Sequence, residues 1–221
     1  WNGTGKGAQG TWPSPKNSYF GIIDTAGFPK DSYYFYQSQW NDEVNTLHIL
    51  PAWNEDAVKK DSSGKVPVVV YTDAKKVELF FTDAKTGDKK SLGTKEFTQK
   101  QSNTQGYTYQ YYEGTDKSGT EHKNLYLTWQ VPYKAGTISA VAYGQDGQKI
   151  SEEKLNGRTS VTTTGEKKNL KATVDRDTIS ADGADLTYVT VDVTDKDGNI
   201  IPNAEDKVSF KVEGEGKLVG I

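Results

Sequence analysis

The sequence predicts a mainly β protein made of antiparallel β-sandwiches, with one helix ahead of them. After residue 41, apolar and polar residues alternate in short segments, which is the period of a half-buried strand. Turn signals separate these segments, and no helical periodicity lies between them. Only the stretch from Pro29 to Trp40 has aromatic residues at the three- and four-residue spacing of an amphipathic helix.

The helix is expected to begin between Pro29 and Ser32 and to run for about ten residues, or three turns. Proline is pre-set for the first helical position, and Asp31 would place a carboxylate in the first turn, where the helix dipole favours it. One face would carry Tyr33, Tyr36 and Trp40, with Phe35 beside them. We therefore predict that these three aromatic residues form a buried seam against a large neighbour.

The first sandwich is predicted over residues 42–163. Strands are expected at 46–50, 65–71, 76–81, 107–111, 125–131 and 137–143, the third with Val77, Leu79 and Phe81 on its inner face. Asp146-Gly147 is typical of a hairpin turn leading into Lys149-Ile150. Strands at such spacing, without helices between them, favour an antiparallel sandwich.

A second, immunoglobulin-like domain is predicted over residues 164–221. The polar segment 157–168 would lead into it, and strands are expected at 170–174, 186–193 and 208–212, with a hairpin turn at 195–199. Only 54 residues run from Lys168 to the end, whereas such a domain needs about 100. We therefore expect the domain to be truncated.

Composition excludes several classes of partner and site. The 27 basic and 30 acidic residues are interspersed and give a net charge of −3, so no basic field would attract nucleic acid. The absence of cysteine excludes disulfides and thiolate sites. No apolar run approaches the about 18 residues of a membrane span, and the chain begins with neither methionine nor a signal peptide. We expect an internal piece of a longer polypeptide.

The N-terminal forty residues resemble a known enzyme family. Ser18-Tyr19-Phe20-Gly21-Ile22-Ile23-Asp24, Ala26-Gly27-Phe28-Pro29-Lys30-Asp31, Tyr33-Tyr34 and Tyr36-Gln37-Ser38-Gln39-Trp40 look like the last turn of the (β/α)8 barrel in glycoside hydrolase family 2, specifically its large β-galactosidases. Trp12-Pro13 and Pro15 fit the same pattern. The resemblance implies that residues 1–41 are the last loop and helix of the barrel, and that β-sandwich accessory domains follow.

The same resemblance implies the chemistry of the whole enzyme. Family 2 enzymes are retaining glycosidases, in which one carboxylic acid protonates the leaving oxygen and a second carboxylate about 5 Å away attacks the sugar. In the family both are glutamates on barrel strands four and seven, upstream of this chain. No catalytic residue is therefore expected here, and Asp24, Asp31, Glu43 and Glu55 are interpreted as caps and solvated loop charges.

Partners and location follow from the resemblance as well. It implies a β-galactoside oligosaccharide or glycan as substrate, the remainder of the same polypeptide as partner, and an extracellular or cell-surface location. Neither a cofactor nor a metal is expected.

Two tryptophans are candidate substrate-binding residues. Trp1 would stand near the loop after barrel strand eight, where an indole face can stack on a galactose ring while its N–H bonds a hydroxyl. The alternative is a tryptophan packed at the barrel rim. Trp12 could likewise contact the sugar or act as a lid on the barrel core.

Other candidates favour structural interpretations. Alternating Tyr107, Tyr109 and Tyr111 could form a carbohydrate-binding strip, but such a pattern more often reflects cross-strand packing. His48 and His122 are too isolated for a metal site and are interpreted as satisfied or exposed histidines. The acidic segments 175–177 and 195–199 resemble partial calcium loops but lack the acidic residue at loop position 12, so turn formation is the expected role. The Gly-rich segment 2–9 lacks the Lys-Ser/Thr and helix of a phosphate loop.

Two functions therefore remain. The first is a part of a retaining β-galactosidase, supplying the strand-eight rim of the sugar pocket and the bracing accessory domains. The alternative is a non-catalytic surface module that binds carbohydrate or forms an adhesin stalk. The aromatic helix favours the enzyme, because burying its aromatic face requires a barrel and an adhesin stalk does not contain one.

Overall fold

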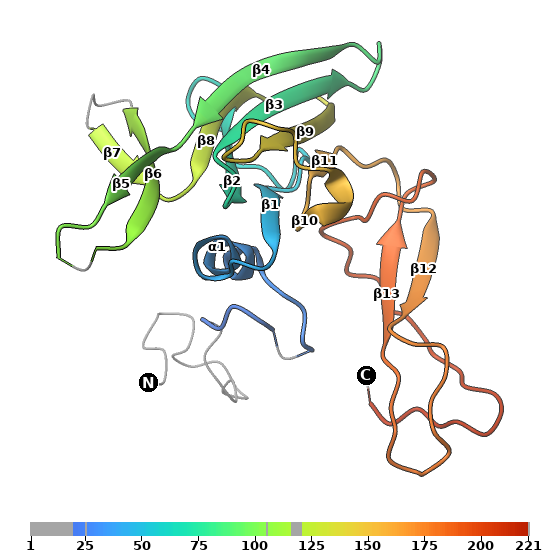
Figure 1. The fold of residues 1–221 in the computed structure, drawn as a ribbon. Helices are drawn as coiled ribbons and strands as arrows, with labels where there is room; N and C mark the ends of the chain where they lie inside the picture. Colours follow the sequence, from blue (N-terminus) through green and yellow to red (C-terminus); the bar gives the residue numbers. More distant parts are fainter. Residues whose placement is uncertain (1–19, 25, 105, 116–120, 221) are drawn as a thin grey trace, which may run out of the picture. The chain divides into compact units, whose positions relative to one another are not determined.

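A computed structural model of the chain describes residues 20–24, 26–104, 106–115 and 121–220. The chain divides into two compact units between Thr163 and Thr164 (Figure 1). The elements are mainly strands in antiparallel sheets, as the sequence predicts. Among the described residues, no helix has the length and apolar character needed to cross a membrane.

The first unit contains a sandwich of two four-stranded sheets. The order in the first sheet is β10 (Leu155–Asn156), β1 (Asn45–Leu50), β2 (Lys65–Thr72) and β8 (Leu127–Pro132). The order in the second is β11 (Ser160–Thr162), β9 (Gly136–Tyr143), β3 (Lys76–Asp83) and β4 (Lys89–Glu96). Neighbouring strands are antiparallel except β1 and β10, which pair in parallel.

The core lies between these two sheets and is filled by the inner faces of their strands. Val77, Leu79 and Phe81 of β3 are buried, so the predicted inner face of this strand is confirmed. Trp53, which follows β1, is fully buried, and its indole N–H donates to the carbonyl oxygen of Lys134 at 2.9 Å. The remaining core side chains are Leu47, Ile49, Val66, Val68, Val70, Ala74, Phe97, Leu127, Trp129, Val131, Ile138, Ala142 and Val161.

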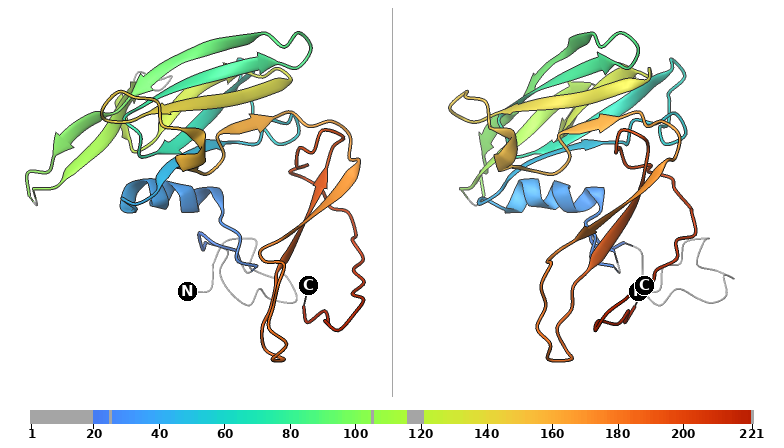
Figure 2. Two further views of the ribbon diagram at one scale, coloured as in Figure 1. Left: turned by 45° about the vertical axis from the view of Figure 1, so that its right-hand side comes forward. Right: turned by 90° about the vertical axis from the view of Figure 1, so that its right-hand side faces the viewer.

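A third sheet extends from the sandwich (Figure 2). It consists of β5 (Thr98–Gln101), β6 (Thr108–Thr115) and β7 (Glu121–Asn124), all antiparallel. The predicted strand 125–131 begins later than expected: Leu125 precedes β8 and is 38% exposed. Leu125 follows β7 directly and belongs to the short connection between the third sheet and β8.

The predicted helix is confirmed as α1 (Asp31–Trp40), which has ten residues. Pro29 does not take the first helical position, because it forms an isolated bridge with Ile23, and Lys30 is the N-cap. Asp31 lies in the first turn, as predicted. The helix contacts β1 and β2 on the face of their sheet that is turned away from β3 and β4 (Figures 1 and 2).

The second unit contains one antiparallel pair, β12 (Asn169–Val174) and β13 (Val189–Thr194). The turn predicted at 195–199 follows β13 and is closed by hydrogen bonds from Asp195 to Asn199 and from Gly198 to Asp195. The strand predicted at 208–212 is wrong. A strand needs a neighbour to complete its ladder, and in the described part of this unit β12 and β13 pair only with each other, leaving Phe210 and Val212 exposed.

Candidate functional site

The contact between α1 and the sandwich is centred on His48 of β1. Its imidazole is almost fully buried and stacks on the ring of Tyr34 from α1, with centroids 4.0 Å apart and 8° between the planes. Nε2 lies 2.7 Å from Oδ1 of Asp31, and Nδ1 accepts the backbone N–H of Arg158 at 3.2 Å. Because Nδ1 is an acceptor, Nε2 carries the proton and donates to Asp31. We call Asp31, Tyr34, His48 and Arg158 the His48 clamp.

Arg158 ties the C-terminal part of the first unit to this clamp. One guanidinium nitrogen lies 3.0 Å from Oδ1 of Asp31, and Nε donates to the carbonyl oxygen of Ile49 at 2.9 Å. Gly157 allows this approach: its φ is +118°, and a Cβ there would lie 2.6 Å from the carbonyl oxygen of Leu47. The glycine thus lets the backbone of Arg158 lie directly against β1.

The charges of the clamp stabilise one protonation state. The hydrogen bond from His48, together with the Arg158 guanidinium, lowers the pKa of the Asp31 carboxyl below its usual value, although partial burial opposes this. Burial lowers the pKa of the His48 imidazole, and the positive charge of Arg158 adds to that effect, while Asp31 opposes it. The clamp is therefore a carboxylate bonded to a neutral imidazole. The prediction that His48 is a satisfied histidine is confirmed, whereas Asp31 is more than a solvated helix-start charge.

Polar and aromatic contacts complete the inner face of α1. Gln37 and Ser38 are buried, and Gln37 accepts the hydroxyl of Thr46 at 3.1 Å. Phe35 meets Tyr71 of β2 edge to face, with ring centroids 5.3 Å apart. The helix is thus held on the sandwich by specific hydrogen bonds and ring contacts rather than by an aliphatic core.

Tyr33, Tyr36 and Trp40, which the sequence predicts to be buried, lie on the face of α1 opposite the sandwich. Trp40 is 77% exposed, Tyr33 and Tyr36 are half-buried, and the Trp40 ring packs on Tyr36 with centroids 4.7 Å apart. The prediction of burial is wrong within this chain, because Tyr34, Gln37 and Ser38 form the face that meets β1 and β2. We call Tyr33, Tyr36 and Trp40 the outer face of α1. Large exposed aromatic surfaces of this kind commonly mark an interaction site.

The segment before α1 is a built turn that also exposes aromatic side chains. Oδ1 of Asp24 accepts the backbone N–H groups of Ala26 and Phe28, each at 2.9 Å, so the predicted capping role of Asp24 is confirmed. Gly27 has a φ of +91°, which glycine adopts without strain. Phe20 is 77% exposed and Phe28 is 47% exposed. These two exposed rings add to the apolar surface at this end of the first unit.

The two predicted sugar-binding residues, Trp1 and Trp12, lie outside the described residues. Their role stays a prediction. The structure instead draws attention to Tyr34 and Gln37, which sequence reasoning did not single out. In the sequence, only their three-residue spacing places Tyr34 and Gln37 on one face of the helix. One aromatic and one polar residue at that spacing are weak evidence that the face is buried.

The tyrosine row that leads into β6 contains both packed and exposed rings. Tyr107, Tyr109 and Tyr111 follow one another with ring centroids 6.2 and 6.0 Å apart. Tyr111 is buried, with the ammonium group of Lys123 5.1 Å from its ring centroid, whereas Tyr107 is 55% exposed. The packing interpretation is confirmed for Tyr111.

The acidic turn after β13 is used by the backbone. Oδ1 of Asp195 accepts the N–H groups of Asp197 and Asn199, each at 2.9 Å, and Oδ2 accepts that of Gly165 at 3.0 Å. These bonds, that from Gly165 first, lower the pKa of Asp195 to about 2. The predicted turn role is confirmed for this segment. In the part of the chain that the structure describes, no three His, Cys, Asp or Glu side chains are grouped so as to hold a metal ion.

Comparison with known families matches two parts of the chain. Residues 170–221 match the glycoside hydrolase family 2 C-terminal domain 5. Residues 63–151, within the first unit, match a domain of unknown function, DUF4982.

Curated relatives are similar over nearly the whole chain. A β-galactosidase of Bacteroides ovatus, BoGH2A, is 32% identical over 210 residues, which are 95% of this chain and 20% of that protein. A protein of Formosa agariphila with the provisional name β-glucuronidase is 34% identical over 203 residues, 91% of this chain and 16% of that protein. The chain therefore spans a fifth or less of the length of these two relatives.

Solved structures give the same picture. A β-glycosidase from Bacteroides vulgatus superposes with a TM-score of 0.56 and 28% identity, over 83% of this chain and 18% of that chain. A glycosyl hydrolase family 2 member from Bacteroides cellulosilyticus superposes with a TM-score of 0.54 and 25% identity, over 83% and 22%.

Proposed function

Because the chain belongs to glycoside hydrolase family 2, we propose that the polypeptide of which it is part is a retaining β-galactosidase that hydrolyses terminal β-D-galactosides. The name of the Bacteroides ovatus relative supports a galactoside substrate. The name of the Formosa agariphila relative makes a β-glucuronide the competing substrate. The proposed enzyme acts outside the cell or at its surface on an oligosaccharide or glycan.

In this proposal the chain braces the catalytic barrel. The observation that carries the proposal is the two-sided helix α1: its inner face is fixed to the sandwich by the His48 clamp, while its outer face exposes Trp40 and Tyr36. A barrel seated on the outer face would bury these rings, and full burial of each large ring is worth about 1.5–3 kcal/mol. The sandwich would then hold the last helix of the barrel in place.

A fixed last helix matters for catalysis because reacting groups must be held within fractions of an ångström. The loop after barrel strand eight precedes this helix in the proposal and forms one rim of the sugar pocket. Trp1 and Trp12 are the residues we propose to contact the sugar from this rim. The two catalytic glutamates would lie upstream of residue 1, as the family resemblance implies.

The substrate is tested by steady-state kinetics of the full-length parent polypeptide on nitrophenyl β-D-galactoside and nitrophenyl β-D-glucuronide. The expected result is a kcat/KM that is at least tenfold higher for the galactoside, a difference of about 1.4 kcal/mol in transition-state binding. The isolated 221-residue chain should turn over neither compound, because the retaining route needs both carboxylates. A preference for the glucuronide would overturn the substrate assignment, and turnover by the isolated chain would overturn the placement of the active site.

The alternative is a non-catalytic carbohydrate-binding or adhesin-type module. The exposed Tyr107 at the start of the β6 tyrosine row favours it, since an exposed ring can stack on a sugar. A full-length parent that binds galactosides in equilibrium dialysis yet hydrolyses no glycoside would favour this alternative over the enzyme.

A further inference from the structure

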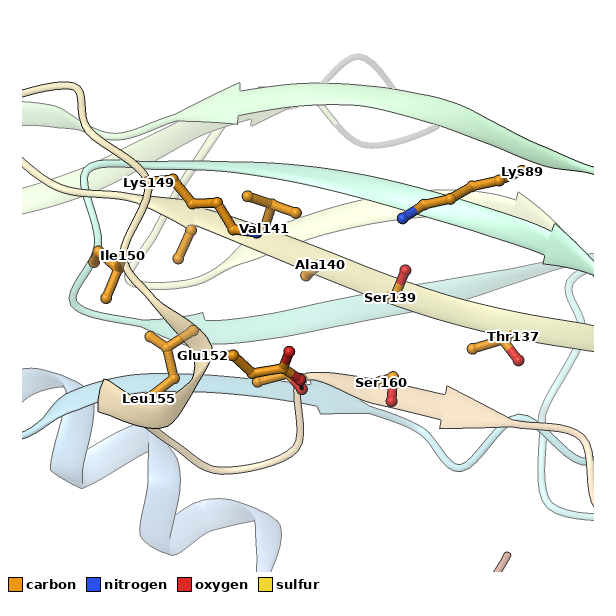
Figure 3. A pocket seen from close by; sticks show the side chains of 12 residues that line it. Lys89, Thr137, Ser139, Ala140, Val141, Lys149, Ile150, Glu152, Leu155 and Ser160 are labelled. Carbon is orange, nitrogen blue, oxygen red and sulfur yellow. Dashed lines mark hydrogen bonds between the residues drawn. The ribbon is translucent and has the colours of Figure 1, made fainter. Parts of the chain in front are cut away.

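The outer face of the second sheet contains a cavity of about 340 Å³ (Figure 3). Its floor is the outward side of β9, including Ser139 and Val141, which alternate with the core residues Ile138 and Ala142. Ser160 of the edge strand β11 lines one side. Paired strands of the first unit therefore form the floor of the cavity, and the segment after β9, which includes Ile150 and Glu152, lines it as well.

Two lysine ammonium groups converge on this cavity from opposite ends. Lys89 of β4 is held by the ring of Phe80, with Nζ 4.5 Å from the ring centroid. Lys149 enters from the turn after β9, where its backbone is bridged to Tyr143. Figure 3 shows the two side chains extending toward each other along β9. Within the described ranges, neither lysine forms an ion pair with a carboxylate, whereas nine other lysine and arginine side chains do.

Hydroxyl groups and one carboxylate complete the polar lining. Ser139 and Ser160 are directly paired across β9 and β11, and neither side chain has a hydrogen-bond partner among the described residues. Thr159 donates its hydroxyl to Glu152 at 2.9 Å, which fixes that carboxylate at the rim while leaving its second oxygen available. The site thus offers two cations, two hydroxyls and one oriented acceptor.

We propose that this cavity binds an anionic saccharide unit, a uronic acid or a sugar sulfate ester within a glycan. The two ammonium groups outweigh the single carboxylate in charge, so the cavity has a net positive charge that would hold the anionic group. The serine hydroxyls and Glu152 would form hydrogen bonds with sugar hydroxyls. Val141, Ile150 and Leu155 supply an apolar surface for the ring carbons. The volume lies within the range of about 300–1,000 Å³ typical of ligand sites. No aromatic ring lines the cavity, so charge rather than stacking would provide recognition.

This inference concerns binding by the accessory sandwich and does not rest on the hydrolytic specificity proposed above. It is tested on the 221-residue chain by isothermal titration and by amide chemical-shift mapping. The probes are digalacturonic acid and a sulfated galactose disaccharide, with the uncharged galactose disaccharide and inorganic sulfate as comparisons. We expect saturable binding of at least one acidic disaccharide, with shifts at Ser139, Val141 and Lys149, and weaker binding as salt is raised.

Variants identify the site. Lys89→Gln and Lys149→Gln should each weaken binding about tenfold, since each removes one charge-assisted contact. Ser160→Leu should abolish binding, because it fills the cavity from an exposed edge position while leaving both lysines in place. Lys100→Gln, which removes an exposed charge from β5 outside the cavity, should leave binding unchanged. Thermal unfolding of each variant confirms that the fold is retained.

The outcomes separate the possible ligands. Binding of the uronate or of the sulfate ester supports the proposal and identifies which anionic group is recognised. Binding of inorganic sulfate as tight as that of both disaccharides would show an anion site only and overturn the saccharide assignment. Equal binding of the uncharged disaccharide, or binding that survives when Lys89→Gln and Lys149→Gln are combined, would overturn the role of Lys89 and Lys149.

Discussion

At the scale of single residues, His48 determines how α1 is attached to the sandwich. Its imidazole is enclosed by Tyr34, Asp31 and Arg158, and both ring nitrogens are used. A proton added to Nδ1 would displace the backbone N–H of Arg158 and place a second positive charge beside its guanidinium. The surroundings of the buried ring therefore stabilise the neutral imidazole over the protonated one.

The first prediction is a loss of stability of the first unit in weak acid. Because the folded pKa of His48 is lowered below the ordinary 6.5, the unfolded chain binds this proton first, and the free energy of unfolding falls as the pH drops below about 6.5. The lowered pKa of Asp31 has the same sign, and its stabilisation is lost as the pH falls below about 3.8. Urea unfolding of the 221-residue chain at a series of pH values measures both.

The variant His48→Gln provides the comparison for this prediction. Glutamine can still donate to Asp31 but does not titrate, so the slope of unfolding free energy between pH 6.5 and 5 should become shallower. At pH 7 the variant should cost about 1–3 kcal/mol, because the backbone N–H of Arg158 loses its acceptor. An unchanged slope would show that the titration of His48 does not contribute to folding.

The second residue-scale prediction concerns Trp1 in the full-length parent. If its indole is a galactose platform, Trp1→Ala should lower kcat/KM roughly ten- to a thousandfold, about 1.4–4 kcal/mol, because the ring also helps hold the distorted sugar of the transition state. Folding should be largely spared. Steady-state kinetics and a melting curve on the same variant test this.

The rival interpretation of Trp1, packing at the barrel rim, predicts the reverse pattern. The melting temperature would fall by several degrees while the kinetics of the folded enzyme stayed nearly unchanged. That result would remove Trp1 from the proposed substrate-binding residues.

At the scale of elements, α1 has two faces with different partners. Tyr34, Phe35, Gln37 and Ser38 meet the first sheet, while the outer face exposes Trp40. The inner face is partly polar, so its contacts depend on correct geometry and add specificity to the docking. The helix is thus attached to the sandwich without using Trp40.

The element-scale prediction compares two substitutions on opposite faces of α1. Tyr34→Ala should destabilise the 221-residue chain by about 1–3 kcal/mol and reduce protection of α1 amides from hydrogen exchange, because it removes the ring that covers His48. Trp40→Ala, the matched control, should change the free energy of unfolding by no more than about 0.5 kcal/mol. Equal effects of the two variants would contradict the assignment of the faces.

Much of the fold could be predicted from local pattern. The alternation of Val77, Leu79 and Phe81 gives β3 its inner face, and the aromatic spacing with Asp31 places α1 correctly. Three features needed knowledge of neighbours instead. The helix turns Asp31 and Gln37 to the sandwich because His48 and Thr46 bind them there. Residues 208–212 have the alternation of a strand but no ladder partner. The cavity of β9 depends on lysines brought together from separate hairpins.

At the scale of the whole molecule, the proposed function gives the chain a bracing role within a longer enzyme. The chain is about a fifth of its Bacteroides ovatus relative. Within the first unit, the His48 clamp ties α1 to β1 and to Arg158, which lies between β10 and β11. A helix anchored in this way can transmit the rigidity of the sandwich to whatever packs on its outer face.

The most direct test is hydroxyl-radical footprinting of Trp40, read by mass spectrometry, in the isolated 221-residue chain and in the full-length parent. Trp40 is 77% exposed in the chain and should be oxidised rapidly there. In the parent its oxidation rate should fall severalfold, because the barrel covers the outer face of α1. Tyr107, which is 55% exposed and lies just before β6, serves as the internal reference and should react equally in both. Equal oxidation of Trp40 in the two proteins would contradict the proposed bracing contact.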